Sequence, residues 1–211
     1  MNGDGKITLD DQQVIGNTLP IHTGGFGLNA GWKGIDLNVN FNWSYGNKVL
    51  NAGKMEYSTL QGSKKYNNLI SDMKLDNRFT TIDPETGKNI YYGADANPDL
   101  LRELNQGKTM WNPILNYSLL HSWAVEDGSF LRLNTLTLGY TIPAKITNKV
   151  KIQALRLFVT AYNLYCWTNY SGQDPEVSTR NTNSSASLTP GVDYSAYPKA
   201  HQYLFGVNLT F

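Results

Sequence analysis

The most regular pattern in the chain is an alternation of apolar and polar residues from Ile35 to Tyr45, which reads IDLNVNFNWSY. Apolar side chains occupy every second position, and Asp, Asn or Ser fills the positions between them. A period of two predicts a β-strand with one apolar and one polar face. Strands of soluble proteins typically run about 5–6 residues, whereas a strand that crosses a membrane needs about 9–11. Length and pattern together favour a membrane-spanning strand.

Four further segments are predicted to be strands. With the first, the predicted ranges are 24–33, 35–46, 129–142, 152–167 and 201–211. Lys33-Gly34 is predicted to form a tight hairpin turn, because glycine accepts a positive φ at low cost. The apolar set changes phase near Asn134, which a one-residue bulge would explain. The last strand alternates up to Phe211, and this terminal aromatic residue is interpreted as the insertion signal of a membrane strand.

The connections between these strands fall into two length classes. Long polar loops cover residues 1–22, 46–128 and 168–200, and short turns lie at Lys33-Gly34 and 143–149. Because neighbouring strands run in opposite directions, all long loops would lie on one side of a membrane and all short turns on the other, as in outer-membrane barrels. In a compact soluble domain, so long a connection would count against the strand assignment. The long loops are therefore expected to be extracellular.

The alternation also assigns side chains to the two faces. The residues expected to face lipid are Ile35, Leu37, Val39, Phe41, Tyr203, Phe205, Val207 and Leu209. The polar residues expected to line the interior are Asp36, Asn38, Asn40, Asn42, Arg156 and Asn208. The aromatic residues near the strand ends are Trp43, Tyr45, Tyr165 and Trp167 on the outer side and Trp32, Tyr140 and Phe211 on the inner side. Two such girdles flank the apolar band of membrane barrels.

The predicted fold class is all-β, namely the C-terminal strands of a large antiparallel transmembrane β-barrel with long extracellular loops. Five strands cannot close a barrel, and an open edge cannot stand in lipid because its N–H and C=O groups would lack partners. The chain is therefore expected to be a fragment that continues upstream or is completed by another chain, and not a closed barrel by itself.

Composition and charge narrow the function classes. The 211 residues carry 18 basic and 17 acidic side chains, a net charge of +1, so no field of one sign is available to attract nucleic acid. The sequence contains no run of about 18 apolar residues, so no transmembrane helix is predicted. Cys166 is the single cysteine, and the three histidines lie far from it in sequence, so a nucleophile beside a base is not indicated. No phosphate loop, zinc spacing or serine elbow occurs, and we do not expect an enzyme.

Several segments resemble the C-terminal region of SusC/RagA-type TonB-dependent outer-membrane transporters. They are NGDGKITLDDQQVIGN (2–17), TGGFGLNAGWKGIDLNVNFNWSYGN (23–47), EDGSFLRLNTLTLGYTIP (126–143), LRLFVTAYNLYCWTNYSGQDPEV (155–177), PGVDYSAYP (190–198) and FGVNLTF (205–211). The resemblance implies a 22-stranded barrel around an N-terminal plug, of which this chain would be roughly the last quarter, without the plug. It further implies a place in the bacterial outer membrane, in contact with lipid, and import of oligosaccharides or sometimes peptides. The implied partners are TonB, which relays energy through the missing N-terminal region, and a SusD-type surface lipoprotein.

The N-terminal segment has the spacing of the later part of an EF-hand-like calcium loop. Asn2 and Asp4 would supply oxygens, Lys6 a backbone carbonyl and Asp11 the closing carboxylate. The first ligand would lie before Met1, and the closing residue is shorter than the usual Glu. The alternative is an Asx/Gly-rich turn in an outer loop, so calcium is the one cofactor that the sequence raises.

Aromatic residues of the loops are the candidates for substrate contact, because Tyr and Trp combine an apolar face with a polar group. The candidates are Tyr91, Tyr92, Trp111, Trp123, Tyr170 and Tyr194, with Tyr197 as a further one. The alternative for each is packing within the loops or contact with the lipoprotein.

Two other readings of the whole chain stay open at this point. One is a soluble all-β carbohydrate-binding or glycoside-acting domain, which would explain the loop aromatics and carboxylates but not strands of eleven residues. The other is a truncated gene product without a function of its own.

Overall fold

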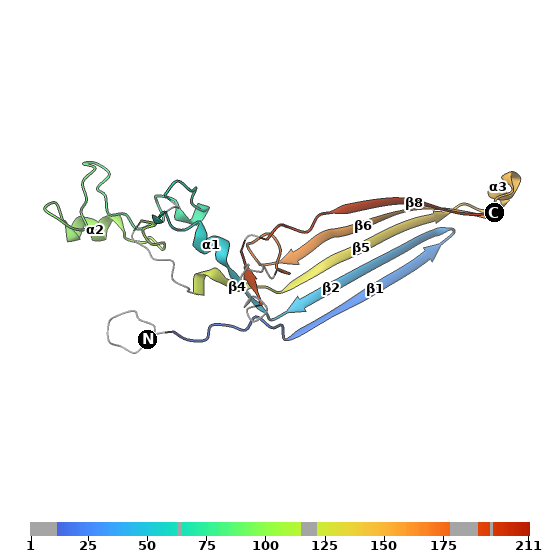
Figure 1. The fold of residues 1–211 in the computed structure, drawn as a ribbon, viewed down its shortest axis with the longest axis horizontal. Helices are drawn as coiled ribbons and strands as arrows, with labels where there is room; N and C mark the ends of the chain where they lie inside the picture. Colours follow the sequence, from blue (N-terminus) through green and yellow to red (C-terminus); the bar gives the residue numbers. More distant parts are fainter. Residues whose placement is uncertain (1–11, 63–64, 115–121, 178–189, 195) are drawn as a thin grey trace. The chain divides into compact units, whose positions relative to one another are not determined.

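The computed structural model describes residues 12–62, 65–114, 122–177, 190–194 and 196–211. The chain divides into two compact units. The first, the sheet unit, comprises Met1–Leu50 and Val125–Phe211, and the second, the loop unit, comprises Asn51–Ala124. All strands that carry the long alternating pattern belong to the sheet unit (Figure 1).

Five long antiparallel strands form the main sheet, in the order β1-β2-β5-β6-β8 (Figure 1). They are β1 (His22–Trp32), β2 (Ile35–Tyr45), β5 (Phe130–Thr141), β6 (Ala154–Thr168) and β8 (Gln202–Thr210). Each strand pairs with the next one along this order in an antiparallel meander, and β1 and β8 are the open edges. The predicted all-β, antiparallel fold class is confirmed, with the sheet unclosed as expected of a fragment.

Lys33 and Gly34 form the two-residue turn between β1 and β2, and both have positive φ, 47° and 90°. Two successive positive φ values define the type I′ turn, whose twist matches that of the flanking strands. Gly34 also has no room for a side chain, since a Cβ there would stand 2.7 Å from the carbonyl oxygen of Thr141. The predicted tight hairpin is confirmed, and Gly34 is required for both its conformation and its space.

The phase change in β5 is a β-bulge, as predicted. The register of β2 against β5 shifts between Asn40 and Phe41 and leaves Asn134 without a partner on β2. A second irregularity, which the sequence pattern does not reveal, lies beside it in β6 at Asn163, where φ is 54°. Asparagine tolerates this left-handed conformation better than most residues. Together the two irregularities keep the apolar side chains of β5 and β6 on one face of the sheet.

A second, smaller sheet was not expected from the sequence. It consists of β4 (Val125–Asp127), β3 (Lys48–Asn51) and β7 (Val192–Asp193), in that order. The backbone N–H of Leu50 also donates to the carbonyl of Gly191, at 2.8 Å, and Val49 is buried with 1% of its surface exposed. The expectation of five strands is thus corrected to eight in the described part of the chain. The added strands of two to four residues are too short to show a period of two.

The connections lie at opposite ends of the main sheet according to their length (Figure 1). The β1–β2 turn and the β5–β6 connection share one end. The β5–β6 connection, expected to be a short basic turn, is helical, with α3 (Ala144–Thr147) followed by the 3₁₀ turn η5 (Asn148–Val150). The segments that lead to the small sheet leave from the other end.

The loop unit contains its own small core. Its elements are α1 (Ala52–Glu56), η3 (Ser71–Met73), α2 (Pro98–Leu104) and η4 (Ser122–Ala124). The side chain of Asn97 caps α2 by accepting from the backbone N–H of Leu100, at 3.1 Å. Met73, with 1% of its surface exposed, is one of the unit's fully buried side chains. None of the helices in the described residues is long and apolar enough to cross a membrane.

Replacing Gly34 by alanine is expected to lower the free energy of unfolding by about 1–3 kcal/mol, because the new side chain must hold a positive φ against the Thr141 carbonyl. The matched control is Gly31→Ala in the same hairpin, where a Cβ would meet only the Ile35 carbonyl oxygen, at 3.9 Å. Denaturant titration followed by tryptophan fluorescence measures both. Equal unfolding midpoints for the two variants would contradict the assignment of this turn.

Candidate functional site on the two faces of the sheet

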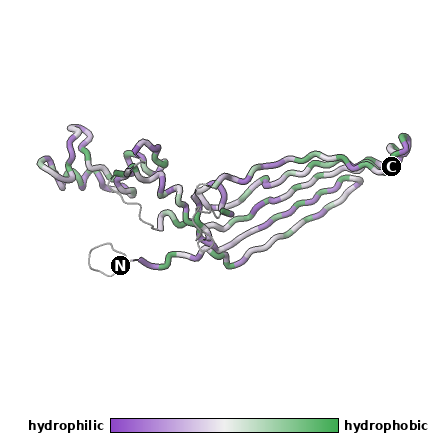
Figure 2. The backbone as a smooth tube through the Cα atoms, viewed as in Figure 1, coloured by the Kyte–Doolittle hydropathy of each residue, from purple (hydrophilic) through white to green (hydrophobic). Residues whose placement is uncertain are grey.

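One face of the main sheet is apolar across all five strands. In an antiparallel sheet, residues directly opposite each other project from the same face. Leu37 of β2 pairs with Leu138, which pairs with Val159, which in turn pairs with Phe205 of β8. The register therefore brings all eight candidates for lipid contact, from β2 and β8, onto one face. Figure 2 shows the alternation as changing colour along each strand.

The apolar face is exposed in the described structure. Phe205 has 78% of its surface exposed, and Tyr203 and Val207 have 62% each. Exposure is less on β2, where Leu37 has 37% of its surface exposed and Val39 is half-buried. A contiguous apolar patch much larger than a few hundred Å² is rare on monomeric soluble proteins and marks a contact surface. This face is therefore a candidate functional surface of the sheet unit.

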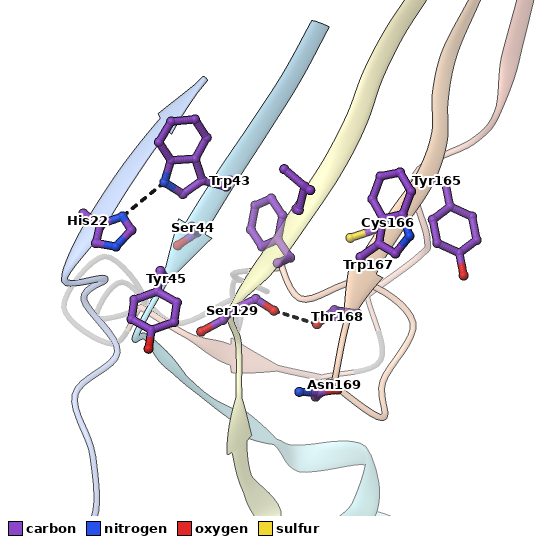
Figure 3. Close-up of a pocket in the computed structure, with 12 residues that line it drawn as sticks. His22, Trp43, Ser44, Tyr45, Ser129, Tyr165, Cys166, Trp167, Thr168 and Asn169 are labelled. Carbon is purple, nitrogen blue, oxygen red and sulfur yellow. Dashed lines mark hydrogen bonds between the residues drawn. The ribbon is translucent and has the colours of Figure 1, made fainter. Parts of the chain in front are cut away.

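Aromatic rings crowd the apolar face at the end where the long connections leave (Figure 3). The indole N–H of Trp43 donates to Nδ1 of His22, at 3.1 Å, and the His22 ring stacks on Tyr45 with centroids 5.1 Å apart. On β6, the rings of Tyr165 and Trp167 lie 4.8 Å apart. These rings border an open groove of about 650 Å³. The four residues predicted for the outer girdle therefore lie at one end of one face.

The short-turn end of the apolar face carries its own aromatic residues. Trp32 and Tyr140 have 67% and 43% of their surfaces exposed, and both sit in the register next to Ile35. The ammonium group of Lys33 lies 4.8 Å from the centre of the Trp32 ring. Phe211 follows β8 at this end and has 78% of its surface exposed.

The opposite face carries a row of carboxamides. Asn38 of β2 donates from Nδ2 to Oδ1 of Asn29 on β1. Asn40 donates in turn to Oδ1 of Asn38, at 2.7 Å. On the neighbouring strands the hydroxyls of Thr137 and Thr160 lie 2.9 Å apart. Two of the side chains predicted to line an interior, Asn38 and Asn40, are thus hydrogen-bonded to each other.

An ion pair spans three strands near the short-turn end of this polar face. Arg156 of β6 donates from Nε to Oδ1 of Asp36, at 2.8 Å, and from Nη2 to Oδ2, at 2.5 Å. The pair crosses β5 at Gly139, where a Cβ would overlap the Arg156 guanidinium and both Asp36 oxygens. The two groups are partly exposed, with 27% and 40% of their side-chain surfaces accessible. Solvent screening therefore limits what the pair adds to stability.

A second arginine, absent from the sequence-based candidates, lies toward the other end of the polar face. Arg132 of β5 donates from Nη2 to Oδ1 of Asp174, at 2.6 Å, and each side chain has only 5% of its surface exposed. Asp174 belongs to the segment that follows β6. Glu176, from the same segment, pairs with Lys199. A charged residue within the apolar run of β5 was the one sequence signal, but nothing in the sequence pairs it with Asp174.

The loop aromatics differ in how far their rings are buried or packed. Tyr170 is buried, and its hydroxyl donates to Oδ2 of Asp193, at 2.6 Å. Burial raises the pKa of the Tyr170 phenol far above its usual range, and the Asp193 carboxylate raises it further. Trp111 and Trp123 pack edge to face with centroids 5.1 Å apart. For these three residues the packing alternative has the better support.

Three other loop aromatics keep exposed rings. Tyr91 and Tyr92 have 51% and 64% of their surfaces exposed and lie in the loop unit, 6.1 Å apart. Tyr194 has 60% exposed and lies in the sheet unit. The six candidates for substrate contact are therefore distributed over both units, and their role stays a prediction.

The candidate calcium ligands Asn2, Asp4, Lys6 and Asp11 lie outside the described residues. Within the described residues, no group of three or more His, Cys, Asp or Glu side chains is placed to hold a metal ion. The calcium site stays a prediction.

Known proteins resemble the chain over its whole length. It is 31% identical over 212 residues to the TonB-dependent receptor P3 of Formosa agariphila. This match covers all of this chain and 18% of that protein. It is 30% identical over 93 residues to the TonB-dependent receptor SusC of Bacteroides thetaiotaomicron, covering 44% of this chain and 8% of that protein. No family model matches the chain.

The fold agrees with solved structures of one system. The structure of the RagAB peptide importer in its closed-closed state superposes with a TM-score of 0.70 at 25% identity, over 98% of this chain and 19% of that chain. The open-open state gives a TM-score of 0.68 over the same shares. The chain thus spans about a fifth of the length of the relatives that it matches throughout.

The two-faced antiparallel sheet, the relatives and the superposed structures agree with the resemblance in the sequence: the chain belongs to the SusC/RagA-type TonB-dependent receptors, of which it represents a small part.

Proposed function

We propose that this chain forms part of the barrel wall of an outer-membrane TonB-dependent transporter that imports oligosaccharides or peptides together with a SusD-type surface lipoprotein. The observation that carries the proposal is the exposed apolar face, which runs without interruption across five strands. A soluble protein would cover such a face with a second layer of structure. In a membrane, lipid covers it.

The dimensions of the strands fit this role. The five strands have 9 to 15 residues. A tilted strand that crosses a membrane needs about 9–11 residues, and even the shortest of the five reaches that length. The open edges at β1 and β8 would pair with other strands of the same barrel, because unpaired backbone groups are costly in lipid. The full-length protein would supply those strands.

The ends of the strands give the orientation. The aromatic cluster around Trp43 and Trp167 would sit at the outer interface, and Trp32 and Tyr140 at the inner one. The loop unit and the small sheet would then be extracellular, and the β1–β2 and β5–β6 turns periplasmic. The polar face, with its carboxamides and two ion pairs, would line the interior.

The proposal includes two substrate classes, peptides and oligosaccharides. The likeness to a peptide importer, at 25% identity over nearly the whole chain, supports peptides. The sequence resemblance supports oligosaccharides. The exposed rings of Tyr91, Tyr92 and Tyr194 would bind them by stacking on sugar rings.

The first test is the size and location of the native protein. An antibody against the loop unit should detect, in the outer-membrane fraction only, a band several times larger than 23.6 kDa that shifts on boiling. The shift is expected because folded membrane barrels resist detergent until they are heated. A soluble band of 23.6 kDa would overturn the proposal.

Val39→Arg is expected to destabilise the folded protein by about 2–4 kcal/mol, because the new charge would face lipid near the midplane. Asn40→Arg is the matched control on the adjacent position and the opposite face, where a mild effect is expected. Urea unfolding in detergent or lipid, followed by the heat-modifiable band, measures both variants. Equal tolerance at the two positions would show that Val39 does not face lipid.

Import by the full-length protein should depend on TonB. Cells that carry the receptor and its lipoprotein should take up a labelled oligopeptide or oligosaccharide, and deletion of TonB should abolish that uptake. A strain without the receptor is the control for other routes. Uptake that continues at full rate without TonB would contradict the transport mechanism, whichever substrate is used.

A further inference from the structure

The two arginines of the polar face use their N–H groups differently. Arg156 engages Asp36 with both Nε and Nη2, each on its own carboxylate oxygen. Arg132 engages Asp174 through Nη2 alone. Its Nε is buried and donates no hydrogen bond to any described residue, and it forms only a longer ion pair with Oε2 of Glu176, at 3.5 Å. Half of the binding edge of Arg132 therefore makes no hydrogen bond within the described part of the chain, although Glu176 balances some of its charge.

The Nε position, which makes no hydrogen bond, indicates the kind of ligand that would fit beside Arg132. The Nε and Nη2 groups of a guanidinium point in parallel and match the two oxygens of a carboxylate. Leaving a buried charged N–H without an acceptor is costly. Asp174 cannot easily rotate to fill it, because its Oδ1 also accepts the backbone N–H of Glu176, at 2.9 Å. Asp174 is thus a partial partner, held by its own loop.

A second unsatisfied atom lies next to the first. Asn42 of β2 is in direct register with Arg132, on the same polar face. Its Oδ1 is buried and also lacks a hydrogen-bond donor among the described residues. A ligand that carries an acidic group beside an N–H or O–H would satisfy both this donor and this acceptor on the paired positions.

We propose that Arg132 is a binding site for a carboxylate of the imported oligomer, and that Asp174 occupies this site as a placeholder when no ligand is bound. The proposal rests on the proposed function and names an acidic substrate class for it. The incoming carboxylate takes both Nε and Nη2 of Arg132, and an N–H or O–H beside it donates to Asn42. Acidic peptides and uronic-acid oligosaccharides both offer this chemistry.

Binding requires movement of the strap, which we define as residues 173–177. The cavity under the strap has a volume of about 250 Å³ and is lined by Arg132, Cys166, Gln173, Asp174, Lys199 and His201. This is below the roughly 300–1,000 Å³ of ordinary ligand pockets, so an oligomer enters only when the strap withdraws. Withdrawal also releases Lys199 from Glu176 and provides a second cation.

Cys166 is a built-in reporter of this movement. It pairs in register with Arg132 and lines the same cavity, where it is partly buried. Its alkylation rate by N-ethylmaleimide is read by mass spectrometry of the peptide that contains it. Measured over a series of pH values, which separates thiol ionisation from access, the rate reports how often the strap is open. The readout needs neither TonB nor transport.

The experiment uses the purified full-length receptor. Asp174→Asn should raise the Cys166 alkylation rate by about tenfold, because the strap loses a charge-assisted hydrogen bond. In the unmodified protein, triglutamate or trigalacturonate should raise the rate, whereas triglutamine and a neutral trisaccharide should not. The acid that acts identifies the source of the carboxylate. Asp36→Asn breaks the other arginine pair and is the matched control, with an unchanged rate and an unchanged response.

Three results would overturn the proposal. The first is a Cys166 alkylation rate in Asp174→Asn equal to that of the unmodified protein, and the second is an equal response to acidic and neutral probes. The third is a full response to acids in Arg132→Lys, which keeps the charge but loses the paired Nε and Nη2 donors. If Asp174→Asn fails to fold, the probe responses of the unmodified and Arg132→Lys proteins decide. A response to acids in a receptor that shows no TonB-dependent uptake would uphold the site and refute transport, so the two failures are distinguishable.

Discussion

The hydrogen-bond register of the main sheet determines the chemistry of both its surfaces. Because the side-chain period along a strand is two, one slipped residue would transfer every apolar side chain of that strand to the polar face. The bulge at Asn134 and the irregularity at Asn163 show how closely the register is maintained. Each absorbs a residue locally, and the apolar positions on either side stay on one face.

On the polar face, long side chains link neighbouring strands by lying over glycine residues. The Asp36–Arg156 pair passes over Gly139, and the ring of Phe158 lies over Gly206, where any Cβ would overlap it. The Arg156 guanidinium in turn lies 5.0 Å from the centre of the Phe158 ring. These contacts tie β2, β5, β6 and β8 together near the short-turn end. At the other end, Arg132 ties β5 to the segment after β6.

How much the sequence predicts depends on how local the determining interaction is. The long strands, the Lys33-Gly34 turn and the bulge at Asn134 follow from neighbouring residues, and they match the expected positions within two residues. The small sheet was missed because its strands pair across tens of residues and are too short to alternate. The Arg132–Asp174 pair joins positions 42 residues apart, through a loop whose path no periodicity encodes. Tyr170 shows the same limit, because only its partner Asp193 reveals that its ring is packed.

The small sheet also has a consequence for how such receptors diversify. Leu50 and Val125, which flank the 74 residues of the loop unit, are direct partners in the ladder between β3 and β4. The chain therefore departs from the sheet and returns to it at adjacent points. An insertion whose two ends lie side by side can be lengthened, shortened or exchanged without displacing the strands that carry it. The loop unit is in this sense an exchangeable insertion, free to change sequence and size while the main sheet keeps its register.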